Sequence, residues 1–332
     1  MSKGKILLVG GAGYIGSHVY IKLHEKGYEP LIFDNFCNSF EDKLNKLEKY
    51  LNKDINYFIG DILNKSNLEE VFELNNIRGV IHLAALKSVP DSDKDHIEYY
   101  KNNISGLINI IEQMAANEVK KMIFSSSATV YGDNAISPVN EEMITESNNT
   151  YGLTKIIGEE IIKNLSRVDK EWSSISLRYF NPAGCSNIDL LNEEPKKFGG
   201  NLFPLIQKCL SSKSNNTFNI YGDDYDTPDG TPMRDFIHVE DLASAHVLAL
   251  DKIIAESNYH QLINVGSGEP KTVLEILKKF EEISNKKIDI CFKQRRLNDI
   301  GASYADIGLA TKELGFTPNH DLDSICRSSL KV

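Results

Sequence analysis

Long apolar runs are missing from this chain of 332 residues. The first apolar stretch, Ile6 to Val9, is too short for the core of a secretory signal peptide. No other run approaches the roughly 20 apolar residues that a membrane-spanning helix requires. We therefore expect a cytoplasmic protein that does not associate with membranes.

Cysteine and arginine are both scarce. The five cysteines form no C-x-x-C pair, so we expect reduced thiols and no bound metal. The net charge of −10 argues against nucleic acid as a partner. With only 7 arginines among the 37 basic side chains, each arginine within a motif is informative, because a few placed locally can still bind a phosphorylated ligand. The cysteines are Cys37, Cys185, Cys209, Cys291 and Cys326.

The chain does contain an alternation of short apolar strands and amphipathic helices in its first half. This pattern predicts an α/β fold with a doubly wound parallel sheet, in which helices cover both faces. The hydrophobic content of 41% and the charged content of 25% are typical of a soluble globular protein. The predicted strands are Lys5–Val9, Pro30–Phe33, Asn56–Ile59, Gly79–Leu83, Lys121–Ser125 and Ser174–Tyr179.

After residue 181 the sequence becomes richer in Asn, Pro, Gly and acidic residues, and the regular alternation stops. Further strands are predicted at Arg234–Val239 and Leu262–Val265, with a helix at Glu240–Ala255 between them. We expect one domain from residues 1–181 plus 235–268. A smaller, mixed α/β substrate domain would comprise residues 182–234 plus 269–332.

Two long helices are predicted from apolar spacing, a continuous one over His96–Ala116 and a second over Tyr151–Ser166. Apolar helix faces usually belong to the core, and the alternative is partial exposure as a dimer surface. A homodimer formed through these two helices is the expected assembly.

A glycine-dense turn follows the first strand and precedes a predicted helix, Ser17–Lys26. Gly10, Gly13 and Gly16 fit the spacing G-x-x-G-x-x-G, and Gly11 with the last two fits G-x-G-x-x-G. In such a turn the glycines allow a sharp reversal, close approach of a pyrophosphate and close packing of helix on strand. The N-terminus of the helix adds partial positive charge.

The second strand ends at Asp34, 18 residues beyond Gly16. A carboxylate at this spacing accepts hydrogen bonds from the adenosine ribose and disfavours a 2′-phosphate. A glycine-rich loop without a ligand is the alternative. Strand, turn, helix and Asp34 together predict a Rossmann-type site for NAD.

Tyr151 and Lys155 lie four residues apart, and therefore on one face of a predicted helix. A neighbouring ammonium lowers the pKa of a phenol, which can then act as a general base near neutral pH. Ser127, after the fifth strand, could hydrogen-bond the same substrate oxygen. The alternative is a set of serines that cap a loop and a solvated lysine.

Blocks of sequence throughout the chain resemble the extended short-chain dehydrogenase/reductase family, and within it the UDP-galactose 4-epimerases. The resemblance implies NAD that is tightly bound and recycled in each turnover, and a transient 4-keto sugar. Tyr151 would take the proton of the sugar 4-hydroxyl, Ser127 would bind that oxygen, and Lys155 would bind the nicotinamide ribose. The blocks are Gly10–Ser17, Asp34–Ser39, Gly60–Ile62, His82–Lys87, Tyr99–Asn103, Phe124–Gly132, Leu177–Pro182 and Arg234–Val239.

The resemblance also implies which residues line the two binding sites. Those expected at the cofactor are Gly10, Gly13, Tyr14, Ile15, Gly16, Asp34, Asn35, Asn38, Ser39, Asp61, Ile62, Leu83, Ala84, Ala85, Lys87, Asn102, Ser127, Tyr151, Lys155 and Phe180. Those expected at the UDP-sugar are Lys87, Ser127, Tyr151, Asn181, Asn201, Leu202, Asn219, Tyr221, Arg234, Arg296, Asp299 and Ser303.

Ser303 bears on the choice of sugar. Some relatives carry a tyrosine at this position, whose ring fills the space beside the sugar 2-position. A serine leaves room for an N-acetyl group, so the resemblance implies activity on UDP-N-acetylglucosamine and UDP-N-acetylgalactosamine as well as on the plain hexoses. The alternative is that Ser303 is merely a small loop residue.

Two other functions compete with epimerisation. Nucleotide-sugar dehydratases and decarboxylases share the fold and the Tyr-Lys pair, and they resemble this chain around residues 125–132. They differ in carrying acidic residues after the serine or threonine. Ala128 and Thr129 stand there and can serve neither as acid nor as base. A non-catalytic dinucleotide sensor typically lacks the Tyr-Lys pair, which this chain retains.

Overall fold

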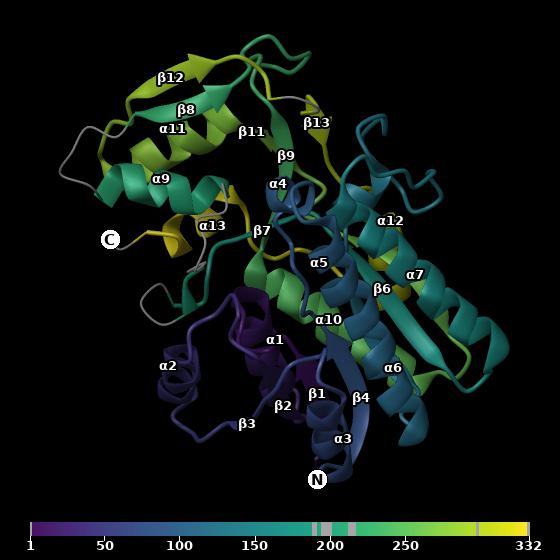
Figure 1. Ribbon diagram of the computed structural model, residues 1–332. Helices are drawn as coiled ribbons and strands as arrows, with labels where there is room; N and C mark the ends of the chain where they lie inside the picture. The colour runs from purple at the N-terminus through teal and green to yellow at the C-terminus, as the bar shows by residue number, and fades with distance from the viewer. Residues whose placement is uncertain (1, 188–190, 194–200, 212–216, 297–298, 331–332) are drawn as a thin grey trace.

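The computed structural model describes residues 2–187, 191–193, 201–211, 217–296 and 299–330. Figure 1 shows a larger unit that contains the N-terminus and a smaller unit that contains α9 (Leu202–Ser211) and α11 (Val273–Ser284). No helix within these ranges is long and apolar enough to cross a membrane.

A seven-stranded parallel sheet forms the centre of the larger unit, in the order β10-β6-β5-β4-β1-β2-β3. The predicted doubly wound fold is therefore confirmed. The strands are β1 (Lys5–Val9), β2 (Glu29–Asp34), β3 (Asn56–Ile59), β4 (Ile77–His82), β5 (Lys121–Ser127), β6 (Ser173–Tyr179) and β10 (His260–Val265).

Alternation along β1 explains why both faces of the sheet are covered. Ile6 and Leu8 point into one apolar core, and Leu7 and Val9 point into the other. The first core is closed by α1 (Tyr14–Glu25), α2 (Asp42–Leu51), α10 (Val239–Ala255) and α12 (Gly308–Leu314). The second is closed by α3 (Lys65–Glu73), α6 (Gly106–Ala116) and α7 (Thr150–Val168).

The helix predicted over His96–Ala116 has three parts. It begins as α5 (His96–Tyr100), widens into the π-helical turn η1 (Lys101–Ser105) and continues as α6. A π turn accommodates an extra residue, and such turns often occur at functional sites. Here the turn carries Asn102 and Asn103. The predicted bounds and continuity of the helix are confirmed, and the π turn within it was not predicted. Two short segments, α4 (Val89–Ser92) and η2 (Ala128–Tyr131), follow β4 and β5.

The smaller unit contains two small sheets on a third apolar core, which α9, α11 and α13 (Leu322–Ser328) share. In one sheet β9 (Met233–His238) pairs with β7 (Asn181–Ala183), β11 (Pro270–Thr272) and β13 (Ala302–Ser303). In the other, β8 (Phe218–Tyr221) pairs with β12 (Ile290–Lys293). The strand predicted after Arg234 thus belongs to the smaller sheet, whereas α10 and β10 join the large one. The exact division into two domains stays a prediction.

Candidate active site

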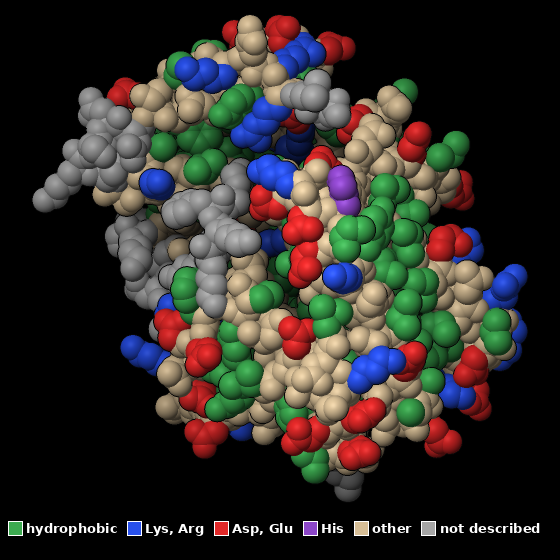
Figure 2. All heavy atoms as spheres, viewed as in Figure 1, with side chains coloured by type: hydrophobic (Ala, Val, Ile, Leu, Met, Phe, Trp, Pro, Cys, Tyr) green, Lys and Arg blue, Asp and Glu red, His purple; other side chains and the backbone are tan. Residues whose placement is uncertain are grey.

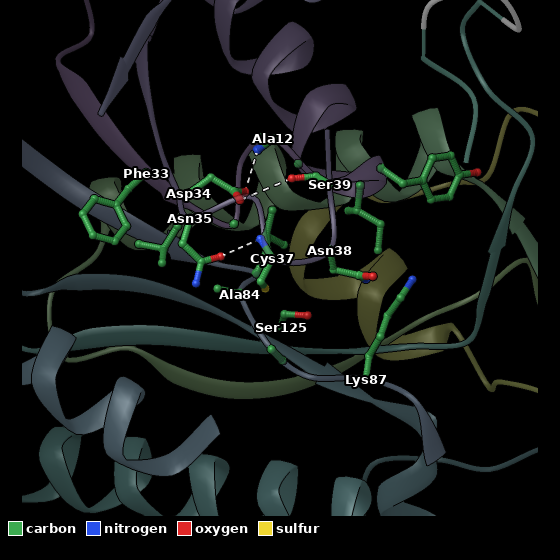
Figure 3. A pocket seen from close by; sticks show the side chains of 18 of the residues that line it. Ala12, Phe33, Asp34, Asn35, Cys37, Asn38, Ser39, Ala84, Lys87 and Ser125 are labelled. Carbon is green, nitrogen blue, oxygen red and sulfur yellow. Dashed lines mark hydrogen bonds between the residues drawn. The ribbon is translucent and has the colours of Figure 1, made fainter. Parts of the chain in front are cut away.

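The strand order of the large sheet reverses at β1: β2 and β3 extend the sheet to one side of it, and β4 and the later strands extend it to the other. Ligands of doubly wound sheets bind in the crevice at this point, outside the carboxyl ends of the strands. A cavity of about 150 Å³ lies there, between the turn after β1, the end of β2 and the segment after β4. We call it the cofactor cavity. Figure 3 shows side chains that line it.

Gly10, Gly13 and Gly16 line the cofactor cavity, and Gly11 is not among its lining residues. The G-x-x-G-x-x-G spacing therefore describes the turn. Gly10 has φ +82°, and a Cβ atom there would lie 2.6 Å from the backbone nitrogen of Ala84. A Cβ atom on Gly16 would lie 2.5 Å from the carbonyl oxygen of Gly10. Since these neighbours are backbone atoms, the turn requires glycine at both positions.

Asp34 is held at the rim of the cofactor cavity by backbone donors. Its Oδ2 accepts the N–H of Ala12 at 3.0 Å, and its Oδ1 accepts the N–H of Phe36 at 2.8 Å. The hydroxyl of Ser39 donates to the same carboxylate at 3.4 Å, as the dashed line in Figure 3 shows. The carboxylate is thus fixed at the end of β2, where ribose hydroxyls would bind.

Fifteen of the 20 predicted cofactor residues line this cavity, and five do not. One of these five, Lys155, is buried and lines neither this cavity nor its neighbour. Asp61 lies behind Asn35, whose amide donates to Asp61 Oδ2 at 2.8 Å. Tyr151, Ser127 and Phe180 line a second, neighbouring cavity. The residues in the first cavity are Gly10, Gly13, Tyr14, Ile15, Gly16, Asp34, Asn35, Asn38, Ser39, Ile62, Leu83, Ala84, Ala85, Lys87 and Asn102.

The second cavity has a volume of about 1110 Å³ and lies between the two units. We call it the sugar cavity. Figure 2 shows Lys and Arg side chains around the hollow between the units. The two cavities adjoin, because Lys87, Asn38 and Glu193 line both of them. Predicted substrate residues that line it are Lys87, Ser127, Tyr151, Asn181, Asn201, Leu202, Asn219, Tyr221, Arg234, Arg296 and Asp299.

Two arginines of the smaller unit reach the sugar cavity, one from a strand and one from the segment after β12. Arg234, on β9, forms an ion pair of 2.6 Å with Asp299. The guanidinium of Arg296 lies over the ring of Tyr221, 4.1 Å from its centroid. The neighbouring Arg295 turns to Asp224 and does not line the cavity. Arg234 and Arg296 are therefore placed to bind a pyrophosphate through their planar donor groups.

Ser303 is not among the residues that line the sugar cavity. It lies on β13, paired in register with Arg234, which does line the cavity. The side chain is partly buried. Ser303 therefore lies beside a cavity wall, one strand away from it.

Tyr151 and Lys155 both lie in the first half of α7, which begins directly after its N-cap Asn149. The side chain of Asn149 accepts the N–H of Gly152 at 2.8 Å and so fixes the start of the helix. The Lys155 ammonium lies 5.7 Å from the centroid of the Tyr151 ring. It is buried and donates a hydrogen bond to the carbonyl oxygen of Ser125, at 2.7 Å.

The surroundings of this pair shift both pKa values. Enclosure by protein raises the pKa of Tyr151 to about 12, and a hydrogen bond with Ser127 lowers it in part. Burial lowers the pKa of Lys155 to about 7, against the opposing effect of Glu159. An apolar setting thus disfavours the charge on each side chain. Only Lys155 therefore titrates near pH 7, where a small electrostatic change alters its protonation.

Several residues at the cavities were not predicted. Glu193 lines both of them, accepts a hydrogen bond from Asn201 at 2.7 Å and lies 3.5 Å from Lys87. Lys43 donates to the carbonyl oxygen of Asn192 at 2.9 Å. These residues belong to no strand–turn–helix pattern and carry no signal that a single sequence reveals.

One group among the described residues has the composition of a metal site, namely His238, Glu240 and His320. The two imidazole rings are stacked, with centroids 4.1 Å apart and an interplanar angle of 18°. Because ring nitrogens bind metals in the ring plane, stacked rings do not converge on one ion. His238 instead accepts the N–H of Glu240 at 3.1 Å and caps α10.

Comparison with known proteins agrees with this geometry. The family model described as "NAD dependent epimerase/dehydratase family" matches residues 6–266. The UDP-glucose 4-epimerase of Dictyostelium discoideum is 42% identical over 327 residues, which cover 98% of this chain and 95% of that protein.

Solved structures give the same result. The crystal structure of UDP-glucose 4-epimerase from Bifidobacterium longum, in complex with NAD+ and UDP, matches with a TM-score of 0.92. Its sequence identity is 40%, and the match covers 98% of this chain and 96% of that one. The UDP-Glc/GlcNAc 4-epimerase from Campylobacter jejuni matches with a TM-score of 0.85 and 31% identity, over 98% of each chain. Because the family model covers most of the chain and relatives match it over nearly its full length, this chain belongs to the NAD dependent epimerase/dehydratase family.

Proposed function

We propose that the protein is a UDP-glucose 4-epimerase, which interconverts UDP-glucose and UDP-galactose with NAD that is tightly bound and recycled. The observation that carries the proposal is the position of Tyr151 and Ser127. Both line the sugar cavity where it adjoins the cofactor cavity, and Lys155 is buried behind them. The relatives named above support the same activity.

The residues of the cofactor cavity fit NAD. The glycine turn leaves its backbone open to a pyrophosphate, and Asp34 would accept hydrogen bonds from the adenosine ribose. Lys87 and Asn102 also line this cavity. When bound, the nicotinamide supplies a hydride acceptor and then a hydride donor for carbon 4 of the sugar.

The chain's own residues would move the proton. Tyr151 would take the proton of the sugar 4-hydroxyl as the carbonyl forms, and would return it when the hydroxyl is restored on the other face. Ser127 would hydrogen-bond the same oxygen. The Lys155 ammonium would stabilise the phenolate form of Tyr151 during the transfer.

The wall of the sugar cavity supports epimerisation rather than elimination. Ala128 offers no acid or base, and the hydroxyl of Thr129 donates to Ser127 Oγ at 3.0 Å. At the far side, Arg234 and Arg296 would bind the pyrophosphate of UDP. Asn219 and Tyr221, on β8, would lie beside the nucleoside.

A coupled assay of purified protein with UDP-galactose tests the proposal. UDP-glucose should form without added NAD, because the cofactor is recycled. The absorbance of reduced nicotinamide should appear transiently on addition of the sugar nucleotide. Release of water to give a 4-keto product in place of UDP-glucose would point to a dehydratase of the same family instead.

The proposal includes the N-acetylated sugars as further substrates on the resemblance at Ser303, which lies beside the cavity wall and does not line the cavity itself. A tyrosine at this position on β13 would add a ring beside Arg234 at the cavity wall. We expect Ser303→Tyr to abolish turnover of UDP-N-acetylglucosamine while turnover of UDP-galactose changes little, since a clash excludes only the larger group. Wild-type protein that converts UDP-galactose but not UDP-N-acetylglucosamine would end this part of the proposal.

Exposed apolar side chains on three neighbouring helices support a homodimer. Ile97 on α5, Ile108 on α6, and Leu153 and Ile157 on α7 are between 37% and 64% exposed. Figure 2 shows apolar side chains over this face of the larger unit. We expect Ile97→Asp combined with Leu153→Asp to give a monomer in analytical ultracentrifugation. Ile144→Asp is the matched control, because Ile144 is 85% exposed but lies outside these helices.

A further inference from the structure

The catalytic face of α7 continues beyond the Tyr-Lys pair. Tyr151, Lys155 and Glu159 follow one another at intervals of four residues, so their side chains form a column along one face of the helix. Lys155 is only 3% exposed and Glu159 only 4%. Burial of an acidic side chain is costly unless it is paired. Glu159 takes no direct part in the proton transfer at Tyr151, so its burial must have another cause.

Glu159 is paired with Arg178, the residue before Tyr179 on β6. The guanidinium donates from Nε to Oε1 at 2.9 Å and from the terminal nitrogen to Oε2 at 2.8 Å, in a bidentate arrangement. The hydroxyl of Ser126, on β5, donates to Oε1 at 2.5 Å. Three donors from two strands thus hold a fully buried carboxylate on α7.

Arg178 is itself held from its other side. It donates to the hydroxyl of Tyr131 at 3.0 Å, and its guanidinium lies 4.9 Å from the centroid of that ring. The Tyr131 hydroxyl donates in turn to Asn264 on β10 at 2.6 Å. Because the guanidinium is fixed by these contacts, the carboxylate of Glu159 cannot turn away from the column.

Among the residues that the structure describes, Glu159 is the acidic group that acts on Lys155. Tyr151 on α7 and His82 on β4 lie near the ammonium, and burial keeps both uncharged near pH 7. Tyr179 on β6, which acts on Tyr151, is held in its neutral form as well. Tyr99 on α5, which faces Tyr151, is also held in its neutral form. The remaining contacts of the ammonium are the Ser125 carbonyl oxygen and the Phe124 ring.

We infer that the Glu159–Arg178 pair positions the catalytic pair: it fixes α7 against β5 and β6, and its carboxylate keeps Lys155 charged inside the protein. Arg178 anchors Glu159, and Glu159 compensates the buried ammonium. Glu159 and Arg178 are thus positioning residues that act through Lys155. The inference rests on the proposed function, since it assigns them to the proton transfer at Tyr151.

The test is the pH dependence of kcat for the conversion of UDP-galactose by the NAD-loaded enzyme. Activity requires the charged form of Lys155, so it falls as pH rises through the pKa of this group. In Glu159→Gln the negative charge that stabilises the Lys155 ammonium is lost, so the pKa of Lys155 falls. The alkaline limb of the pH profile should then move to lower pH by about 1 to 2 units. This is the shift expected for a charge about 6 Å away at an effective dielectric constant of about 20.

A matched control separates electrostatics from loss of packing. Tyr131→Phe removes one hydrogen bond of Arg178 without changing any charge. It should lower the melting temperature but leave the pH profile in place. Because Glu159→Gln leaves a buried guanidinium without its carboxylate and can unfold the protein, the double variant Glu159→Gln, Arg178→Gln provides a second measurement. Its alkaline limb should also move to lower pH, by less than that of the single variant.

The outcomes distinguish failure of the proposed epimerase function from failure of the positioning role of Glu159. Wild-type protein without epimerase activity at any pH would overturn the proposed function. Active wild-type protein whose folded Glu159 variants keep the wild-type alkaline limb would overturn the positioning role alone. An equal shift in Tyr131→Phe would also overturn it, because the effect would then not depend on the charge of Glu159.

Discussion

Replacing Tyr151 by phenylalanine removes one hydroxyl group from the wall of the sugar cavity. In the protein without ligands the pKa of this phenol is about 12, so only about one molecule in 10⁵ carries a phenolate at pH 7. The proton must therefore be taken during the reaction, with the charge of Lys155 stabilising the phenolate. A general base of this kind contributes about 10²- to 10⁴-fold to the rate. This corresponds to about 3 to 5 kcal/mol of transition-state stabilisation.

We expect kcat of Tyr151→Phe to fall by that factor, while the affinity for UDP hardly changes, because Arg234 and Arg296 are untouched. The assay is single-turnover conversion of UDP-galactose together with calorimetric titration of UDP. Tyr99→Phe is the matched comparison, because Tyr99 lines the same cavity. This substitution removes a hydroxyl group that donates to the carbonyl oxygen of Ser88 at 2.7 Å. Its loss of kcat should stay below about tenfold. Near-normal turnover by Tyr151→Phe would refute the assignment of the general base.

Two further predictions concern the cofactor and the response to acid. Because Asp34 accepts hydrogen bonds at the ribose position and repels a 2′-phosphate, nucleotide released from the denatured protein should have the mass of NAD; NADP would contradict the role of Asp34. Burial lowers the pKa of His82 to about 3, below that of an unfolded histidine, about 6.5. The unfolded chain therefore binds a proton that the folded one does not, and stability falls as pH drops from about 6.5 to about 3. The variant His82→Leu should show a shallower decline of melting temperature over this range, and an unchanged slope would show that His82 does not contribute.

The strands and the cofactor turn could be predicted from sequence because their signals are local. β1 and β3 begin and end at the predicted residues, since short apolar runs bounded by polar residues define them. The glycine spacing was ambiguous in sequence. It was resolved only by the approach of Gly10 to Ala84, a contact between segments more than 70 residues apart.

Features that depend on tertiary contacts were not predictable. The π turn η1 places the side chain of Asn103 between Leu86 and Thr154, with hydrogen bonds of 2.9 Å and 3.0 Å. An apolar pattern with a period of 3.6 residues contains no trace of such an insertion. The family and the fold class could be predicted because the sequence contains the family's motifs in a fixed order, and both predictions are confirmed. Glu193 lines both cavities only because the fold brings it there, and no sequence motif indicates this position.

The crossing of the chain between the two units has a consequence for how the protein is made. β10 pairs with β6, and α10 packs on α1, yet both arrive only after the chain has passed through the smaller unit. Until residue 265 has left the ribosome, β6 presents an open edge, and the core containing Ile6 and Leu8 lacks its cover of Leu242 and Leu250. Such edges and apolar faces invite aggregation. The nascent chain therefore completes its nucleotide-binding sheet late, and fragments that end near residue 181 should depend on chaperones to remain soluble.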